Sequence, residues 1–286
     1  MKSYLSLVPI SAKVRKRQNR MTILCVIISI FLVTAIFSVA DMMIRTQSDR
    51  MTGKNGSWHI ELDGISQETA LKIAERDDVV SIGAVTIFNP DGELPYRMDG
   101  KRVVLYGIDE SYLTMNSTGA AEGRFPQGMG EIMLSSNAAR VLQVAVGDTV
   151  TLRTPSGDWD FTVSGLGGVE ESYYSGQYSL MDAYLPRTAF AALMEQNNVH
   201  NLQTSYYVQF TSASKAAKAI PELTAQHNLP ENAVSENTGV MAIAGHSDSS
   251  AAKNVYSLAA VLFVLVLLAG VLMISGSMNS NLAQRI

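Results

Sequence analysis

Residues 21–40 (MTILCVIISIFLVTAIFSVA) form an apolar stretch that contains neither a charged residue nor a proline. A helix rises roughly 1.5 Å per residue, so a stretch of this length spans about 30 Å, the thickness of the hydrocarbon core of a membrane. In lipid the backbone must satisfy its own hydrogen bonds, which a helix does. We therefore predict a first transmembrane helix over residues 21–44, continued by a helical stalk over residues 41–55.

The residues before this stretch are basic, and no acidic residue precedes Asp41. Positively charged flanks stay in the cytoplasm, so residues 1–20 are expected on the inner side. They are either an amphipathic segment lying at the membrane surface or a disordered basic tail. The basic residues are Lys13, Arg15, Lys16, Arg17 and Arg20.

Two other interpretations of residues 21–40 exist. Ser38-Val39-Ala40 loosely fits the cleavage site of a signal peptide, but the apolar stretch exceeds the usual length of about 7–15 residues for a signal core. The second alternative is that residues 21–40 form a buried core helix of a soluble protein, but the basic residues before them argue against it.

A second uncharged stretch lies near the other end, from residue 254 to residue 284. We predict a second transmembrane helix over residues 254–276, with Tyr256 at an interface where aromatic residues gather. Two crossings make the chain a multi-pass protein of the cell membrane. Residues 45–253 are then extracytoplasmic, and residues 277–286 begin a cytoplasmic segment.

Composition excludes several classes of function. The chain has 286 residues and a net charge of −4, and outside the N-terminus it has no basic patch, so nucleic-acid binding is not expected. Cys25 is the one cysteine, which excludes a disulfide framework.

The predicted ectodomain has an α+β pattern. Strand-helix-strand units are expected at residues 57–100 and 200–236, and they can pair into one sheet. A β-rich subdomain at residues 101–199 is then inserted between them. The fold class is membrane α-helical plus α+β, with two transmembrane helices and helical stalks flanking this extracytoplasmic domain.

Local signals sharpen parts of this pattern. Ser66 and Ser135 are expected to cap helices. Pro155-Ser156-Gly157-Asp158 should join the arms of a hairpin. Pro221 should kink or restart a helix over residues 214–226, and residues 240–250 are a hinge or the top of a second stalk.

Residues that carry chemistry are sparse. His59, His200, His227 and His246 lie in separate elements without metal-ligand spacing. The sequence contains no G-x-S-x-G and no phosphate-binding G-x-x-x-x-G-K-[ST]. Residues 166–184, with Glu170-Glu171 and several tyrosines, are either an exposed loop that contacts a partner or a solvated loop that packs its tyrosines.

Several short motifs follow one another between the two predicted transmembrane helices. Their order and spacing resemble those of the MacB-like periplasmic core domain of FtsX-like ABC transporter permeases. The motifs are Gly107-Ile108-Asp109, Glu122-Gly123-Arg124-Phe125-Pro126, Glu131-Ile132-Met133-Leu134-Ser135, Ala138, Val146-Gly147-Asp148-Thr149-Val150 and Phe161-Thr162-Val163-Ser164-Gly165.

The resemblance implies a permease subunit that pairs as a dimer, contacts membrane lipid and works with a separate ABC ATPase. The ATP then belongs to the partner subunit, and this chain is neither an enzyme nor the holder of a metal or cofactor. The motif residues are expected to be structural, with the glycines as turn-formers. They are Gly107, Asp109, Gly123, Arg124, Pro126, Glu131, Gly147, Asp148 and Gly165.

Permeases of this family usually continue with two further membrane helices, so the chain resembles their N-terminal half, as a fragment, a truncated gene product or a split subunit. The alternative function is a two-helix sensory receptor with an extracellular ligand domain. A membrane-tethered hydrolase lacks any arrangement of nucleophile and base.

Overall fold

The computed structural model describes residues 16–89, 95–116, 120–167, 180–243 and 251–282. The chain divides into two compact units, Met1–Ser48 with Ser249–Ile286 and Asp49–Asp248. We describe each unit by itself. The boundaries that the sequence predicts for the domains stay a prediction.

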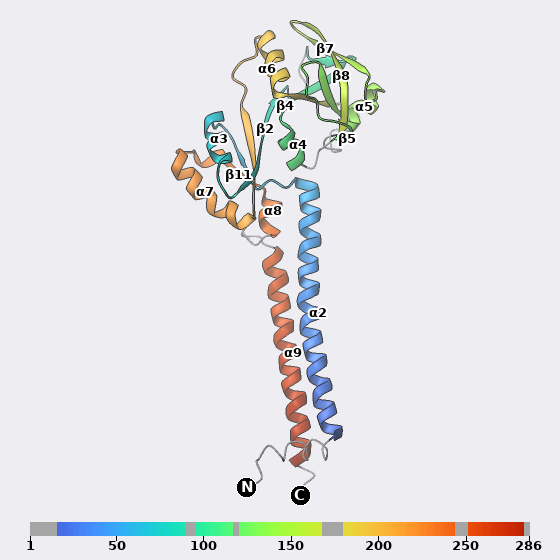
Figure 1. Ribbon diagram of the computed structural model, residues 1–286, viewed down its shortest axis with the longest axis vertical. Coiled ribbons are helices and arrows are strands. Elements are labelled where there is room, and N and C mark those ends of the chain that lie inside the picture. Colours follow the sequence, from blue (N-terminus) through green and yellow to red (C-terminus); the bar gives the residue numbers. More distant parts are fainter. Residues whose placement is uncertain (1–15, 90–94, 117–119, 168–179, 244–250, 283–286) are drawn as a thin grey trace. The chain divides into compact units, whose positions relative to one another are not determined.

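The first unit contains two apolar helices, α2 (Lys16–Asn55), whose last residues belong to the second unit, and α9 (Ala251–Leu282) (Figure 1). Many large apolar side chains of α2, such as Phe31, are exposed. Water-soluble proteins rarely expose an apolar surface of this extent, so the exposure fits a helix that lies in lipid. Phe37 and Phe263 pack with ring centroids 5.8 Å apart.

Within the described residues, one helix is long and apolar enough to cross a membrane, namely Ile23–Asn55 of α2. The expectation that the first helix continues through residues 41–55 is confirmed, because α2 ends at Asn55, while the role of this part as a stalk stays a prediction. The apolar part of α9, Ser257–Leu272, is shorter, so the second crossing stays a prediction.

The second unit contains a mixed 11-stranded sheet. One end of the strand order is β11-β1-β10-β2, with antiparallel pairing throughout. These strands come from the two strand-helix-strand units that the sequence indicates, and they do pair into one sheet. Their bounds are β1 (Ile60–Leu62), β2 (Val79–Phe88), β10 (Thr204–Phe210) and β11 (Val234–Glu236).

Two helices cover one face of this part of the sheet, α3 (Gln67–Ala74) and α7 (Ala213–His227). The period-2 alternation of β1 places Ile60 and Leu62 in the core. The side chain of Ser66 caps α3 as predicted, accepting a hydrogen bond from the backbone N of Thr69 at 3.1 Å.

The remaining strands form a closed ring of pairings, β4-β3-β7-β8-β6-β9 and back to β4, with β5 added on β8. Strand β4 also pairs with β2, so it belongs to both parts of the sheet. The strands are β3 (Arg97–Met98), β4 (Lys101–Ile108), β5 (Ala120–Gly123), β6 (Glu131–Ser135), β7 (Thr149–Thr154), β8 (Gly157–Gly167) and β9 (Leu180–Pro186).

The ring has its own apolar core, to which α5 (Ser136–Leu142) and α6 (Arg187–Gln196) contribute. Ser135 caps α5 as predicted, because its side chain accepts a hydrogen bond from the backbone N of Ala138. The largest fully buried side chains of this core include Met98, Leu105, Ile132, Leu134 and Phe161.

The predicted hairpin is confirmed, because β7 and β8 pair antiparallel, but its turn is shorter than expected. Thr154 pairs with Gly157, so the turn is only residues 155–156, and Gly157 and Asp158 already lie in β8. Of the two outcomes expected at Pro221, a restart of the helix is excluded because α7 is continuous through it, and a kink stays a prediction. Helix α4 (Glu110–Met115), the 3-10 helix η2 (Glu231–Ala233) and helix α8 (Thr238–Ile243) were not predicted.

Candidate functional site

Four of the motif residues, Gly123, Arg124, Glu131 and Gly165, lie around one loop. Within it, Arg124 and Glu131 form a two-pronged ion pair. Arg124 Nη1 donates to Glu131 Oε2 at 2.9 Å, and Nη2 donates to Oε1. The backbone N–H groups of Gln127 and Gly128 donate to the same carboxylate at 2.8 and 3.2 Å. The carboxylate therefore holds both ends of the loop between β5 and β6.

The two glycines of this cluster permit a close backbone contact. A Cβ on Gly165 would overlap the carbonyl oxygen of Arg124, and a Cβ on Gly123 would overlap that of Ser164. Gly123 also has a φ of 72°, which favours glycine. The backbone N of Arg124 donates to the Ser164 carbonyl at 2.9 Å. Strand β5 therefore requires glycine on both sides of its contact with β8.

Gly147 and Asp148 bind strand β8 at Val163, two residues before Gly165. The N–H of Gly147 donates to the carbonyl of Val163, and the N–H of Val163 donates to the carbonyl of Asp148, both at 2.8 Å. The Asp148 carboxylate accepts a hydrogen bond from the N–H of Ala145 at 2.8 Å. Pro126 is buried in the neighbouring loop.

Gly107 and Asp109 lie elsewhere, at the end of β4. A Cβ on Gly107 would overlap the ring of Phe190 from α6, so glycine lets this helix approach the strand. The Asp109 carboxylate accepts from the N–H groups of Tyr112 and Ala84, each at 2.9 Å, and so caps α4. Burial raises the pKa of Asp109.

The motif residues thus make contacts with backbone groups and with each other that position loops. These contacts support the structural role that the resemblance implies. That none of these residues acts on a substrate, a metal or a cofactor stays a prediction.

The histidines stay apart where the structure describes them. His59 is buried, and its Nδ1 accepts a hydrogen bond from the N–H of Phe210 at 3.1 Å. His200 is exposed and His227 lies at the end of α7, while His246 falls outside the described residues. Within those residues, no group of three His, Cys, Asp or Glu side chains is placed to hold a metal ion.

A buried asparagine ties together the places where the chain enters and leaves the core domain. Nδ2 of Asn237 donates to the carbonyls of Asn55 and Trp58 at 3.3 and 3.0 Å. Its backbone N–H donates to the carbonyl of His59 at 2.9 Å. A Cβ on Gly239 would overlap the side-chain amide of Asn55. We call this contact of Asn237 with Asn55 and Trp58 the Asn237 clasp.

Two titratable groups lie next to the clasp on β1 and β10. Glu61 accepts a hydrogen bond from the hydroxyl of Tyr207 at 2.7 Å, and these residues are direct partners in the sheet. Burial raises the pKa of Glu61, and it also raises the pKa of Tyr207. The ring of Trp58 packs edge-on against Tyr207 with centroids 4.8 Å apart. This side of the sheet is therefore partly polar where the chain enters.

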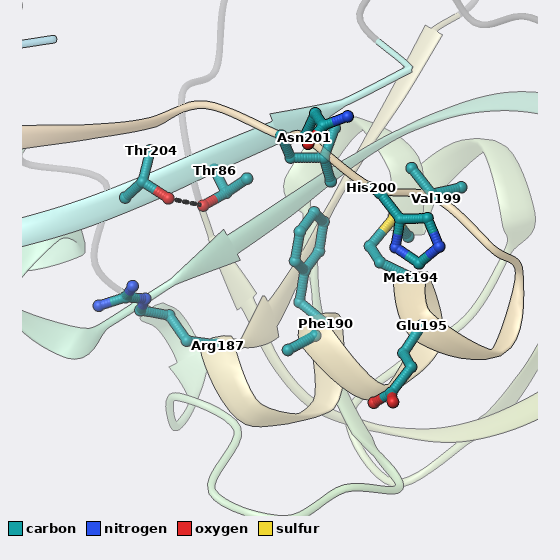
Figure 2. A pocket seen from close by; sticks show the side chains of 11 residues that line it. Thr86, Arg187, Phe190, Met194, Glu195, Val199, His200, Asn201 and Thr204 are labelled. Carbon is teal, nitrogen blue, oxygen red and sulfur yellow. Dashed lines mark hydrogen bonds between the residues drawn. The ribbon is translucent and has the colours of Figure 1, made fainter. Parts of the chain in front are cut away.

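A cleft of about 420 Å³ lies between α6 and the paired strands β2 and β10 (Figure 2). The hydroxyls of Thr86 and Thr204 are 2.7 Å apart in its wall. Figure 2 shows Arg187 on one side of the Phe190 ring and His200 on the other. The lining residues are Thr86, Arg187, Phe190, Ala191, Met194, Glu195, Val199, His200, Asn201, Leu202 and Thr204.

Comparison with known proteins identifies the family. The family model of the MacB-like periplasmic core domain matches residues 21–226, well over half of the chain. The chain belongs to this family. The predicted resemblance to MacB-like and FtsX-like permeases is therefore confirmed.

Solved structures similar to this MacB-like chain have low sequence identity. The periplasmic region of MacB from Actinobacillus actinomycetemcomitans is 14% identical, covers 69% of this chain and 96% of its own, and has a TM-score of 0.48. The extracellular domain of the ABC-type transporter YknZ from Gram-positive bacteria is 15% identical, with coverages of 63% and 98% and a TM-score of 0.44.

A third solved structure is a permease-protein domain from Porphyromonas gingivalis. It is 16% identical, with coverages of 64% and 88% and a TM-score of 0.41. No curated protein matches the chain. The family and the apolar helix α2 together locate this MacB-like chain at a membrane, with an extracellular α+β core domain.

Sequence reasoning missed two features of the MacB-like core domain. Asn237 precedes a helix that begins at Thr238, and asparagine is a preferred residue at that position, so a capping signal was present. The cleft is lined by residues of β2, α6 and β10, and no local sequence pattern shows that these three elements lie side by side. The segment with Glu170-Glu171, predicted as a partner or solvated loop, lies outside the described residues except at its ends.

The Arg124–Glu131 pair gives the MacB-like core domain a predictable dependence on pH. The hydrogen bonds from Arg124, Gln127 and Gly128 lower the pKa of Glu131 from 4.5 to about 2. A carboxylate with a lowered pKa in the folded state stabilises the fold fully above pH 4.5, and this stabilisation is lost as the pH falls towards 2.

We therefore expect Glu131→Gln to lower the free energy of unfolding by about 1 kcal/mol at pH 7, because the ion pair is partly exposed. The difference from wild type should shrink between pH 4.5 and pH 2. Thermal unfolding of the full chain in lipid nanodiscs, followed by tryptophan fluorescence, measures the difference in stability at pH 7 and its change with pH. Glu122→Gln, at an exposed position on β5, is the control. A difference that stays constant down to pH 2 would contradict this assignment.

Proposed function

We propose that the chain is the membrane subunit of an ABC-type exporter or mechanotransmission complex. A separate ATPase subunit in the cytoplasm supplies the ATP chemistry, and this chain carries no catalytic residue. Membership of the MacB-like family supports the proposal, as does the lack of a phosphate-binding motif in the sequence.

The proposal includes a two-pass layout, with both termini in the cytoplasm and residues 45–253 outside. The basic residues before residue 21 favour a cytoplasmic N-terminus. The exposed apolar side chains of Ser257–Leu272 support a second crossing by α9, although this apolar part is shorter than that of α2. We further propose that two copies pair as a dimer in contact with lipid.

The Asn237 clasp is the observation that carries the coupling mechanism. Helix α2 is continuous from Lys16 to Asn55, so its end presents a rigid element to the core domain. At Asn55 the clasp joins that end to the residue before α8, on the chain's path towards α9. A displacement of α2 is therefore passed through the clasp to β1 and to the edge strand β11, its partner in the sheet, as one rigid-body movement.

Purification of the full chain under gentle conditions tests the proposal. A tagged chain extracted in mild detergent should retain a subunit that carries the P-loop motif of an ATPase, identified by mass spectrometry. An unrelated two-span membrane protein with the same tag is the control. Recovery of the chain without any ATPase, or with a signalling kinase in its place, would contradict the proposal and favour the sensory receptor.

A further inference from the structure

The cleft between α6 and the strands β2 and β10 combines a cation with an apolar floor. Arg187 lines it and is partly buried, and no carboxylate of the described residues lies within ion-pair distance of its guanidinium. At longer range its charge opposes the effect of burial on the pKa of Asp109. A partly desolvated guanidinium without a close counter-ion favours an anion in the adjoining space.

The threonine pair adds a second donor to this end of the cleft. Thr86 and Thr204 are direct partners in the sheet, and their hydroxyls bond to each other at 2.7 Å. One hydroxyl donates in that bond, so the other keeps its proton available for a ligand. Figure 2 shows the pair and Arg187 on the same side of the Phe190 ring.

The rest of the cleft limits what the anion carries. Phe190 and Met194 supply an apolar floor, and both are themselves almost fully buried, which keeps the floor fixed. At the opposite side lies the exposed carboxylate of Glu195, which disfavours a second negative charge there. The volume of about 420 Å³ suits a small molecule and not a folded partner.

We propose that this cleft binds a small apolar carboxylate, with its carboxylate on Arg187 and the Thr86–Thr204 pair and its apolar part against Phe190 and Met194. The carboxylate belongs to a free organic acid or to the C-terminus of a short apolar peptide, since both present the same group. The proposal does not depend on the partner or the transport role of the chain.

Calorimetric titration of the full chain in lipid nanodiscs tests this site, with empty nanodiscs as the reference. The probes are 4-phenylbutyrate and its uncharged amide, which has the same size. For a ligand this small we expect binding of the acid in about the millimolar range, and binding of the amide about ten-fold weaker. N-acetyl-leucyl-phenylalanine and its amide form the peptide arm, and the tighter of the two acids identifies the source of the carboxylate.

Variants separate the site from general effects on the fold. Arg187→Gln should weaken binding of the acid about ten-fold and leave the amide unchanged, whereas Arg187→Lys should retain part of the affinity. Ala191→Phe, at an exposed position of the lining, should fill the cleft and abolish binding of both. Arg140→Gln on α5 is the matched control. Circular dichroism checks that each variant is folded.

Three results would overturn the proposal. These are equal affinity for acid and amide, unchanged acid binding by Arg187→Gln, and the absence of saturable binding by either acid at about ten times the expected dissociation constant.

Discussion

Replacing Gly165 with alanine is expected to lower the free energy of unfolding of the core domain by about 3 kcal/mol or more. The added methyl group would overlap the carbonyl oxygen of Arg124, which is backbone and cannot rotate away. Relief of the overlap requires β5 to separate from β8, which breaks the hydrogen bond from the N–H of Arg124 to Ser164. For a domain of about 200 residues this corresponds to a fall in Tm of about 6–12 °C.

Gly130→Ala is the matched control for this prediction. Gly130 lies in the loop that Arg124 and Glu131 hold, and a Cβ there would meet nothing within 4 Å. Its Tm should stay within about 2 °C of wild type, as for most surface substitutions. Equal effects of the two substitutions would mean that the close contact of β5 with β8 does not support the fold.

Replacing the buried Asn237 with alanine is expected to cost about 2 kcal/mol of stability, because it leaves partly buried carbonyl groups without their donor. The carbonyls of Asn55 and Trp58 lose the side-chain amide, and α8 loses the cap that Asn237 Oδ1 provides to the N–H of Val240. Hydrogen exchange should rise locally at residues 55–59 and 237–243, because the clasp opens at both segments.

Asn237→Asp distinguishes the clasp from the cap. Aspartate keeps an acceptor for the helix cap but replaces the amide donor with a negative charge facing carbonyl oxygens. We expect Asn237→Asp to lower the free energy of unfolding at least as much as Asn237→Ala does. If Asn237 acted only as a helix cap, Asn237→Asp would instead have about the stability of wild type. Asn232→Ala, at an exposed position of η2, should change neither stability nor exchange.

Much of the fold is encoded locally, which is why sequence patterns predicted it. The alternation of Ile60 and Leu62 with polar residues identifies β1, and serines at residues 66 and 135 mark the starts of α3 and α5. Residues 79–88, which are rich in valine and isoleucine, form β2 within the strand-helix-strand unit predicted at residues 57–100. Each of these signals depends on neighbours within a few residues.

Long-range pairing was beyond the reach of the same patterns. The parallel contact of β4 with β9 closes the ring and joins residues about eighty positions apart, and no turn signal specifies it. Helix α4 was not predicted, although Asp109 before its first residue is a preferred capping residue. The motif around Arg124 was identified by resemblance, but its ion pair with Glu131 required the structure.

The candidate sites also depend on long-range packing that local sequence patterns do not show. Asn237 acts on backbone groups near residue 55, so its importance depends on the meeting of two distant segments. Arg187 is an ordinary first residue of a helix in sequence, and only the packing of α6 beside β2 and β10 places it in a cleft. Burial and the absence of a close counter-ion among the described residues distinguish it, and both are properties of the fold.

The central claim is that a cytoplasmic ATPase moves the core domain through the helices of this chain. The most direct measurement uses the complex of the chain with its ATPase in nanodiscs, in a Cys25→Ser background. A spin label at the exposed Lys72 on α3 reports, by pulsed electron resonance, the distance between the core domains of the two copies in the proposed dimer. We predict that ATP binding shifts the distance distribution and that hydrolysis restores it. Identical distributions in the nucleotide-free, ATP-bound and post-hydrolysis complexes would contradict the account.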